Sequence, residues 1–261
     1  MEASTTNRID EAFETKRGLL NVYYTAGYPE LGDTLRVAKN LQQGGADMLE
    51  IGIPFSDPIA DGPTIQQSSM KALENGMTLS VLFEQLSELR KDVRVPVLLM
   101  GYINPIIQFG IEKFCSECQR VGIDGVILPD LPMKEYLTEF EALFNAHGLH
   151  NIFLISPNTH PDRIEAIDRQ SSGFIYMVSS SSITGAKQGI RAEQVKYFER
   201  INEMGLSNPR LIGFGISDHE SFTKACIYAD GAIIGSAFIN QLGTDASDTA
   251  IRKFVHKIKG T

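Results

Sequence analysis

Glu50 and Asp61 stand at the two ends of a short segment whose residue types suit acid–base chemistry. The segment reads Glu-Ile-Gly-Ile-Pro-Phe-Ser-Asp-Pro-Ile-Ala-Asp, with Pro54 and Pro58 inside it and Pro63 just beyond it. Glu50 lies near the end of an apolar run, where a carboxylate is costly unless it is paired or lies at an opening. Prolines fix a backbone torsion and stiffen a loop. The pattern therefore favours a preorganised site with two carboxylates.

A purely structural role is the alternative for the same acids. Glu50 can be a rim carboxylate that a neighbouring group satisfies, and Asp61 or Thr64 can cap the helix that follows the loop. Tyr102 and Tyr176 follow or end other apolar runs, where each can line an aromatic pocket or pack in the core. The residues alone leave these alternatives open.

Glycines at the ends of two late apolar runs are candidates for a phosphate site. Gly213 and Gly215 end one run, and Gly235 and Ser236 follow the next and start a helix. Glycine lets backbone N–H groups approach an anion, and a helix N-terminus attracts one. The third glycine of a dinucleotide fingerprint is missing. Tight turns are the alternative, but the paired placement favours phosphate.

The elements that must position these residues are strands alternating with helices. Continuous apolar runs are typical of parallel strands buried on both faces. The predicted strands are Leu19–Thr25, Met48–Gly52, Val97–Gly101, Gly125–Leu128, Ile152–Ile155, Phe174–Val178, Leu211–Gly215 and Ala232–Ile234. The predicted helices include 33–41, 80–90, 111–121, 133–146 and 251–258, a helix containing Phe238, and one that opens with a capping box from Ser217 to Glu220.

Eight strand–helix units in a chain of 261 residues predict a single (β/α)₈ barrel domain over residues 1–261, with an extra helix at the N-terminus. An open, doubly wound sheet is the alternative fold. In such barrels the active site lies at the carboxyl ends of the strands. Glu50, the loop to Asp61 and the late glycines would then share one end of the molecule.

Composition narrows the function classes. The formal net charge of −8 argues against a nucleic-acid partner. Three cysteines suit a reducing compartment, and Cys115 and Cys118 are expected to be ordinary helix residues rather than a zinc or redox pair. No signal peptide and no apolar stretch long enough to cross a bilayer is present, so we expect a cytoplasmic protein without a membrane partner.

Several motifs together resemble the tryptophan synthase alpha subunit family over essentially the whole chain. The long signature is Leu49 to Gly62. Supporting motifs, in matching order and spacing, are 24–29 (YTAGYP), 100–105 (MGYINP), 128–132 (LPDLP), 156–158 (SPN), 183–185 (ITG), 213–217 (GFGIS) and 235–237 (GSA).

This resemblance implies retro-aldol cleavage of indole-3-glycerol phosphate to indole and glyceraldehyde 3-phosphate, with no metal or organic cofactor. It implies that Glu50 is the catalytic acid or base, that Asp61 holds the indole N–H, and that Tyr176 is an active-site tyrosine. The implied phosphate-binding residues are Gly185, Gly215, Gly235 and Ser236, with Phe214 beside them. The implied indole pocket comprises Tyr23, Met100, Tyr102, Ile127 and Leu154, together with Tyr176.

The serine- and glycine-rich segment 179–189 is expected to form a lid, or else a long solvated loop. Many family members carry an arginine four residues before the threonine of the Thr-Gly pair, whereas this chain has Ser180 there. Thr184 and Lys187 are therefore the expected closing contacts.

The resemblance also implies a partner, a pyridoxal-phosphate-dependent beta subunit that receives indole in an α₂β₂ heterotetramer. Asp57, Pro58, Asn104 and Pro105 match its docking surface, and an ordinary active-site rim is the alternative. A stand-alone lyase that releases indole is a further possibility.

Two other functions compete with this one. A sugar-phosphate isomerase or epimerase on the same barrel would need a different base or a metal. However, His147 and His150 precede the fifth strand, at the opposite barrel end, and His160 stands alone. A non-catalytic activator of the beta subunit is the second, and the presence of both Glu50 and Asp61 argues against it.

Overall fold

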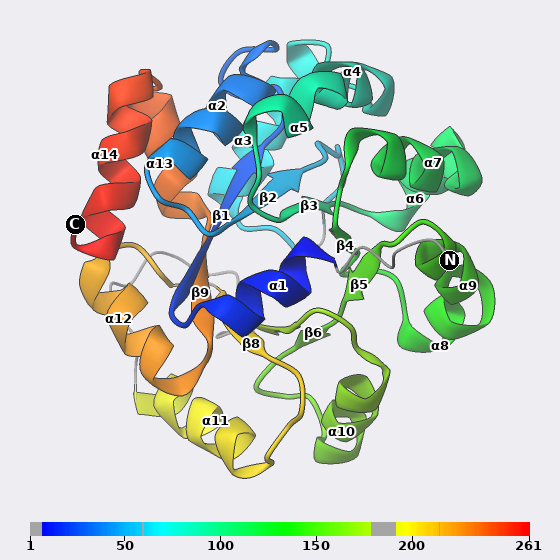
Figure 1. Ribbon diagram of the computed structural model, residues 1–261, viewed down its shortest axis with the longest axis vertical. Coiled ribbons are helices and arrows are strands. Elements are labelled where there is room, and N and C mark those ends of the chain that lie inside the picture. Colours follow the sequence, from blue (N-terminus) through cyan, green and yellow to red (C-terminus); the bar gives the residue numbers. More distant parts are fainter. Residues whose placement is uncertain (1–6, 59, 179–191, 214) are drawn as a thin grey trace.

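The computed structural model describes residues 7–58, 60–178, 192–213 and 215–261, and it has the predicted parallel α/β barrel (Figure 1). Each predicted strand is present to within two residues at either end. The strands are β1 (Leu19–Thr25), β2 (Met48–Gly52), β3 (Val97–Met100), β4 (Gly125–Ile127), β5 (His150–Ile152), β6 (Leu154–Ile155), β7 (Ile175–Val178), β8 (Arg210–Gly213) and β9 (Gly231–Ile234).

The ring of strands closes through a break in the fifth predicted strand. The sheet order is β5-β4-β3-β2-β1-β9-β8-β7-β6, and every pairing is parallel. Strand β5 pairs with β4, whereas β6 pairs with β7. Phe153 lies between the two pieces, and its carbonyl accepts a hydrogen bond from Tyr176 N at 2.9 Å. One continuous segment therefore joins both ends of the sheet, which gives the eight positions of the predicted barrel.

Helices surround the strands, and several predicted helices are divided. A π-helical turn at 136–140 splits the predicted helix 133–146, and a 3₁₀ turn at 86–88 splits the predicted helix 80–90. The helices are α1 (Arg8–Thr15), α2 (Asp33–Gln43), α3 (Pro63–Glu74), α4 (Leu79–Gln85), α5 (Leu89–Asp92), α6 (Ile103–Phe109), α7 (Ile111–Val121), α8 (Met133–Glu135), α9 (Glu141–Ala146), α10 (Pro161–Gln170), α11 (Ala192–Glu203), α12 (His219–Tyr228), α13 (Ser236–Thr244) and α14 (Asp248–Lys259).

Two predicted helix caps differ from the structure. Helix α12 begins one residue later than expected, because the Asp218 side chain accepts from Ser221 N while Ser221 Oγ accepts from Asp218 N. Helix α3 has Gly62 at its N-cap, without a side-chain cap, and Pro63 in its first turn. Neither Asp61 nor Thr64 caps that helix, so the Asp61 carboxylate is available for another role.

The additional N-terminal helix α1 lies across one end of the barrel, inside the ring of helices (Figure 1). Its buried residues Ile9 and Phe13 join a cluster that fills the barrel interior and includes Leu98 of β3 and Leu211 of β8. An added Cβ at Gly125, where β4 begins, would lie 3.0 Å from the Ile9 side chain. Helix α1 therefore closes the amino ends of the strands and leaves the carboxyl ends open.

Two buried aspartates tie the helices to this closed end. Asp47 accepts hydrogen bonds from Lys16 and Lys259 at 2.8 and 2.6 Å. Asp124 accepts from Arg8 and Arg90 at 2.8 and 2.5 Å. No described helix is long and apolar enough to cross a membrane.

Candidate active site

Glu50 lies in the middle of β2 with its side chain in the barrel interior. It is level with Tyr23 of β1 and Leu98 of β3, and only 1% of it is exposed. Asn21 Nδ2 donates to Glu50 Oε2 at 3.0 Å, while Oε1 has no hydrogen-bond partner among the described residues. Burial raises the pKa of Glu50 to about 8; the Asn21 hydrogen bond opposes this rise, and the charge of Asp61 adds to it. This pKa favours the protonated form of Glu50 at neutral pH.

Asp61 is half-buried at the end of the loop that follows β2. Tyr102 Oη donates to Asp61 Oδ2 at 3.1 Å and accepts from Ala60 N at 3.0 Å. The ring of Tyr102 packs against Phe55, with the ring centroids 5.2 Å apart. Burial raises the pKa of Asp61, and the hydrogen bond from Tyr102 opposes the rise. Tyr102 thus holds both the loop and the carboxylate in place.

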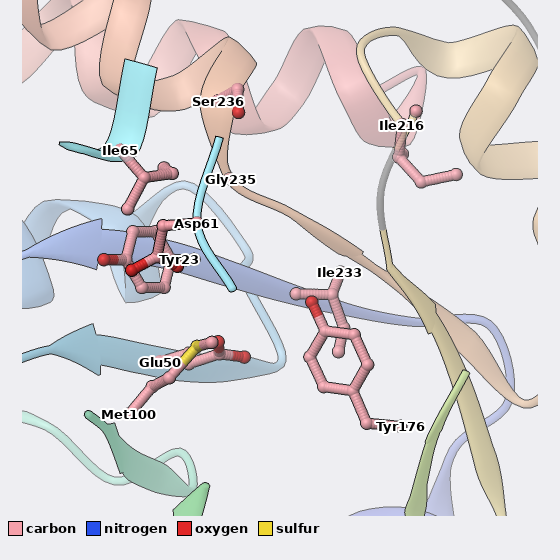
Figure 2. A pocket seen from close by; sticks show the side chains of 11 residues that line it. Tyr23, Glu50, Asp61, Ile65, Met100, Tyr176, Ile216, Ile233, Gly235 and Ser236 are labelled. Atoms are coloured by element: carbon pink, nitrogen blue, oxygen red, sulfur yellow. The ribbon is translucent and has the colours of Figure 1, made fainter. Parts of the chain in front are cut away.

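A pocket that is partly open to solvent brings most of the predicted groups together at the carboxyl ends of the strands (Figure 2). Glu50 and Asp61 lie toward one side of it, and Tyr176 and Ile216 lie toward the other. The predicted residues that line it are Tyr23, Glu50, Asp61, Met100, Tyr176, Gly215, Gly235 and Ser236.

Two glycines make room for the pocket's tyrosine rings. An added Cβ at Gly52 would lie 2.1 Å from Tyr23 Oη, and one at Gly213 would lie 2.4 Å from Tyr176 Oη. Both distances are too short for a real contact. Each tyrosine ring therefore lies over the backbone of a neighbouring strand. Gly213 is needed there because any side chain would collide with the Tyr176 ring.

Backbone groups suited to an anion lie at the same pocket. Gly235 is the N-cap of α13, no side chain caps that helix, and Ser236 is exposed in its first turn. Gly215 is exposed and has a φ of +80°, which glycine adopts without strain. The positive end of a helix dipole beside glycine backbone is typical of a phosphate site.

Other predicted site residues lie outside this pocket or cannot be placed. Ile127 is fully buried in the barrel-interior cluster, Leu154 packs against that cluster, and Tyr102 is buried behind Asp61. Ser180, Thr184, Gly185, Lys187 and Phe214 lie outside the described residues.

Four residues of the site were not identified in the sequence. Ile65, Ile216 and Ile233 line the pocket, but isoleucines at such positions have the pattern of ordinary core residues. Asn21 contacts Glu50 directly. Its signal was a polar side chain inside the otherwise mainly apolar run Leu19–Thr25, where burial is costly without a partner.

The remaining candidates for chemistry lie elsewhere. His150 Nε2 bonds with Asp10 of α1 at 2.9 Å, at the closed end of the barrel. His160 caps α10. Cys115 and Cys118 are buried free thiols of α7 whose pKa values burial raises. None of these side chains lines the pocket.

Comparisons with known proteins agree with this arrangement. A model of the tryptophan synthase alpha chain family matches residues 9–259. The tryptophan synthase alpha chain of Flavobacterium psychrophilum is 52% identical over 252 residues, covering 97% of this chain and 99% of that protein. The crystal structure of the Legionella pneumophila tryptophan synthase alpha chain is 32% identical, with a TM-score of 0.85 and coverage of 97% and 96%. The tryptophan synthase complex of Pyrococcus furiosus gives 34% identity, a TM-score of 0.84 and coverage of 94% and 99%.

Proposed function

The chain belongs to the tryptophan synthase alpha chain family and is an indole-3-glycerol-phosphate lyase, and we propose that Glu50 is its proton donor and acceptor. The observation that carries this proposal is the position of Glu50 in the pocket. It is buried in the same pocket as Asp61, its pKa of about 8 favours the protonated form at neutral pH, and its Oε1 has no partner among the described residues. A carboxyl group in this state can act first as an acid and then as a base.

In the proposed reaction Glu50 gives one proton and takes another. The Glu50 carboxylic acid gives its proton to C3 of the indole ring. The resulting carboxylate then takes the proton of the glycerol hydroxyl on the carbon bonded to C3. That C–O bond becomes the aldehyde, the bond to C3 breaks, and its electron pair returns to the ring. Indole and glyceraldehyde 3-phosphate leave, and Glu50 is protonated again.

Asp61 stabilises the positive charge that these proton transfers create on the indole ring. Protonation at C3 spreads positive charge toward the ring nitrogen. An ionised Asp61, held by Tyr102, accepts a hydrogen bond from that N–H, most strongly when the charge is present. Tyr23, Met100 and Tyr176 surround the ring. Gly215, Gly235 and Ser236 bind the phosphate, with Gly185 and Phe214 completing the site and Thr184 and Lys187 closing it.

Indole release from the purified chain tests these roles. Glu50→Gln keeps the shape of the side chain but removes the transferable proton, so the rate should fall by about 10²–10⁴-fold. Asp61→Asn should lower the rate while leaving phosphate binding intact. Glu112→Gln, an exposed change on α7, is the matched control. A Glu50→Gln protein that cleaves at the wild-type rate would contradict the proposal and favour a non-catalytic activator.

We also propose that the chain passes indole to a beta subunit in an α₂β₂ assembly. The structural neighbour from Pyrococcus furiosus is a tryptophan synthase complex. Asp57 and Asn104 are exposed, and Pro58 and Pro105 are half-buried. Pro105 also lines an apolar groove with Pro54 and Phe109. Co-elution with a purified beta subunit should weaken when Asp57 and Asn104 are both changed to alanine, and unchanged co-elution would exclude this docking surface.

A further inference from the structure

Asn21 is a fully buried amide in the interior of the barrel. It lies on β1 beside Met48 of β2 and Ile233 of β9, both apolar. A leucine would have a similar size and would need no hydrogen bond. A buried amide at such a position is costly, and the cost requires a specific partner.

That partner is Glu50, and the contact between the two side chains is one-sided. Asn21 Nδ2 donates to Glu50 Oε2 at 3.0 Å. Neither Asn21 Oδ1 nor Glu50 Oε1 has a partner among the described residues. The carbonyl oxygen of a carboxylic acid accepts a hydrogen bond better than its hydroxyl oxygen does. The N–H group at Oε2 therefore favours the carboxyl proton on the other oxygen, Oε1.

We propose that Asn21 is the positioning residue for Glu50: it holds Oε2 as a permanent acceptor and so confines the transferable proton to Oε1. The inference rests on the proposed role of Glu50. The N–H···Oε2 bond can persist in both protonation states, because the carboxylate and the carbonyl oxygen of the acid both accept it. Glu50 then keeps one orientation through both proton transfers.

If the Asn21 amide had the opposite orientation, the expected effect on the pKa of Glu50 would be the opposite. If Asn21 were turned over, Oδ1 would accept a proton from Oε2 and would stabilise the acid. A donor instead stabilises the carboxylate and lowers the pKa of Glu50. Among the described residues, the groups with charge or a titratable proton that interact with Glu50 from other elements are Asp61, Tyr23 and Tyr176. They are the same in every Asn21 variant, so the change in the Glu50 titration reports on Asn21.

The test is a titration of the Glu50 carboxyl carbon by ¹³C NMR in the unliganded full chain. Glu50→Gln identifies the signal by removing it. In Asn21→Leu the midpoint should rise by about one pH unit or more, as expected for loss of a hydrogen bond to a charged group. In Asn21→Asp, which keeps the size but adds a like charge, it should rise further. Asn151→Leu changes another buried strand asparagine with an unpartnered oxygen and should leave the midpoint unchanged.

Indole release by the same variants should slow, and the pH at which the rate changes should move with the midpoint. An unchanged or lowered midpoint in Asn21→Leu would overturn the proposal. If Asn21→Leu does not fold, the proposal is overturned by an Asn21→Asp protein in which the Glu50 midpoint does not rise. These outcomes differ from failure of the proposed function, which would show as full activity in Glu50→Gln whatever Asn21 does.

Discussion

Glu50 and Asp61 face the same pocket from different surroundings, and this difference divides their roles. Glu50 is 1% exposed and has an amide for its polar partner. Asp61 is half-buried and accepts from the Tyr102 hydroxyl. Burial therefore keeps the proton on Glu50 at neutral pH, while Asp61 is the better placed of the two to be ionised. Enzymes that use two carboxylates commonly separate their protonation states in this way.

The pH dependence of cleavage should report on this separation. With a pKa of about 8 for Glu50, the rate of indole release should fall above that pH as the acid form is lost. Asp61→Asn removes a negative charge that raises the pKa of Glu50. The rate should therefore be lower at every pH, and its fall at high pH should begin at a lower pH than in the wild type. Rate profiles between pH 6 and 10 measure both effects. A limb that stays in place in Asp61→Asn would show that the two carboxyl groups are not coupled.

Removal of the Tyr102 hydroxyl should act on Asp61 and on the loop that carries it. The hydrogen bond from Tyr102 lowers the pKa of Asp61, so Tyr102→Phe should raise it. The ascending limb of the rate profile, where Asp61 ionises, should then move to higher pH. Tyr24→Phe is the matched control, because it removes a buried hydroxyl that donates to Thr34 O away from the pocket. Equal shifts in both variants would contradict a specific role for Tyr102.

At the level of residues, the two acids that border a stiff loop could be predicted, whereas an isolated amide inside a strand could not. Glu50 and Asp61 stand out because a stiff loop joins two acids at the end of an apolar run. Asn21 follows no motif, and its role appears only once β1 and β2 are paired. Ile216 and Ile233 cannot be told from core residues until the pocket is known.

At the level of elements, the strands were predictable because their apolar runs are continuous. The departures arise from backbone contacts that no local pattern records. The fifth strand divides at Phe153 because its two halves pair with different neighbours. The predicted helix 133–146 contains a π-helical turn, and the cap of α12 lies on Asp218 rather than on Ser217. None of these departures changes the barrel.

Helix α1 should contribute to stability and not to catalysis. Ile9 is fully buried at the closed end of the barrel. Ile9→Ala should therefore lower the free energy of unfolding by about 2–5 kcal/mol. Indole release at 25 °C should remain unchanged, because the pocket lies at the opposite end. Urea denaturation and rate assays measure the two effects, with the exposed Glu14→Ala on the same helix as control. A large loss of rate in folded Ile9→Ala protein would contradict this division.

At the level of the whole molecule, the closed end of the barrel stabilises the fold, and the open end holds the proposed catalytic residues. At the closed end, Asp47 joins Lys16, just before β1, to Lys259 at the end of α14. The segment between α1 and β1 and the last helix thus meet on one buried carboxylate, which supports the proposal of a single domain. At the open end no cation from the described part of the chain acts on the buried Glu50, and its ionisation opposes folding.

This cost should be visible in the stability of the protein. The pKa of Glu50 is about 8 in the folded chain and near its ordinary value of 4.5 when unfolded. Between these pH values the unfolded chain has lost the proton while the folded chain retains it. The contribution of Glu50 to the free energy of unfolding should therefore fall as the pH rises through this window, by up to about 1.4 kcal/mol per pH unit.

Glu50→Gln removes that ionisation and keeps the acceptor for Asn21, so the variant should be more stable than the wild type, and its advantage should grow from pH 5.5 to pH 8. Urea denaturation at pH 5.5, 7 and 8 measures the difference. Glu112→Gln, which changes an exposed glutamate, should follow the wild-type pH dependence. A constant difference between Glu50→Gln and wild type across this range would mean that Glu50 ionises as easily in the folded chain as in the unfolded one. Its role as a proton donor at neutral pH would then be lost.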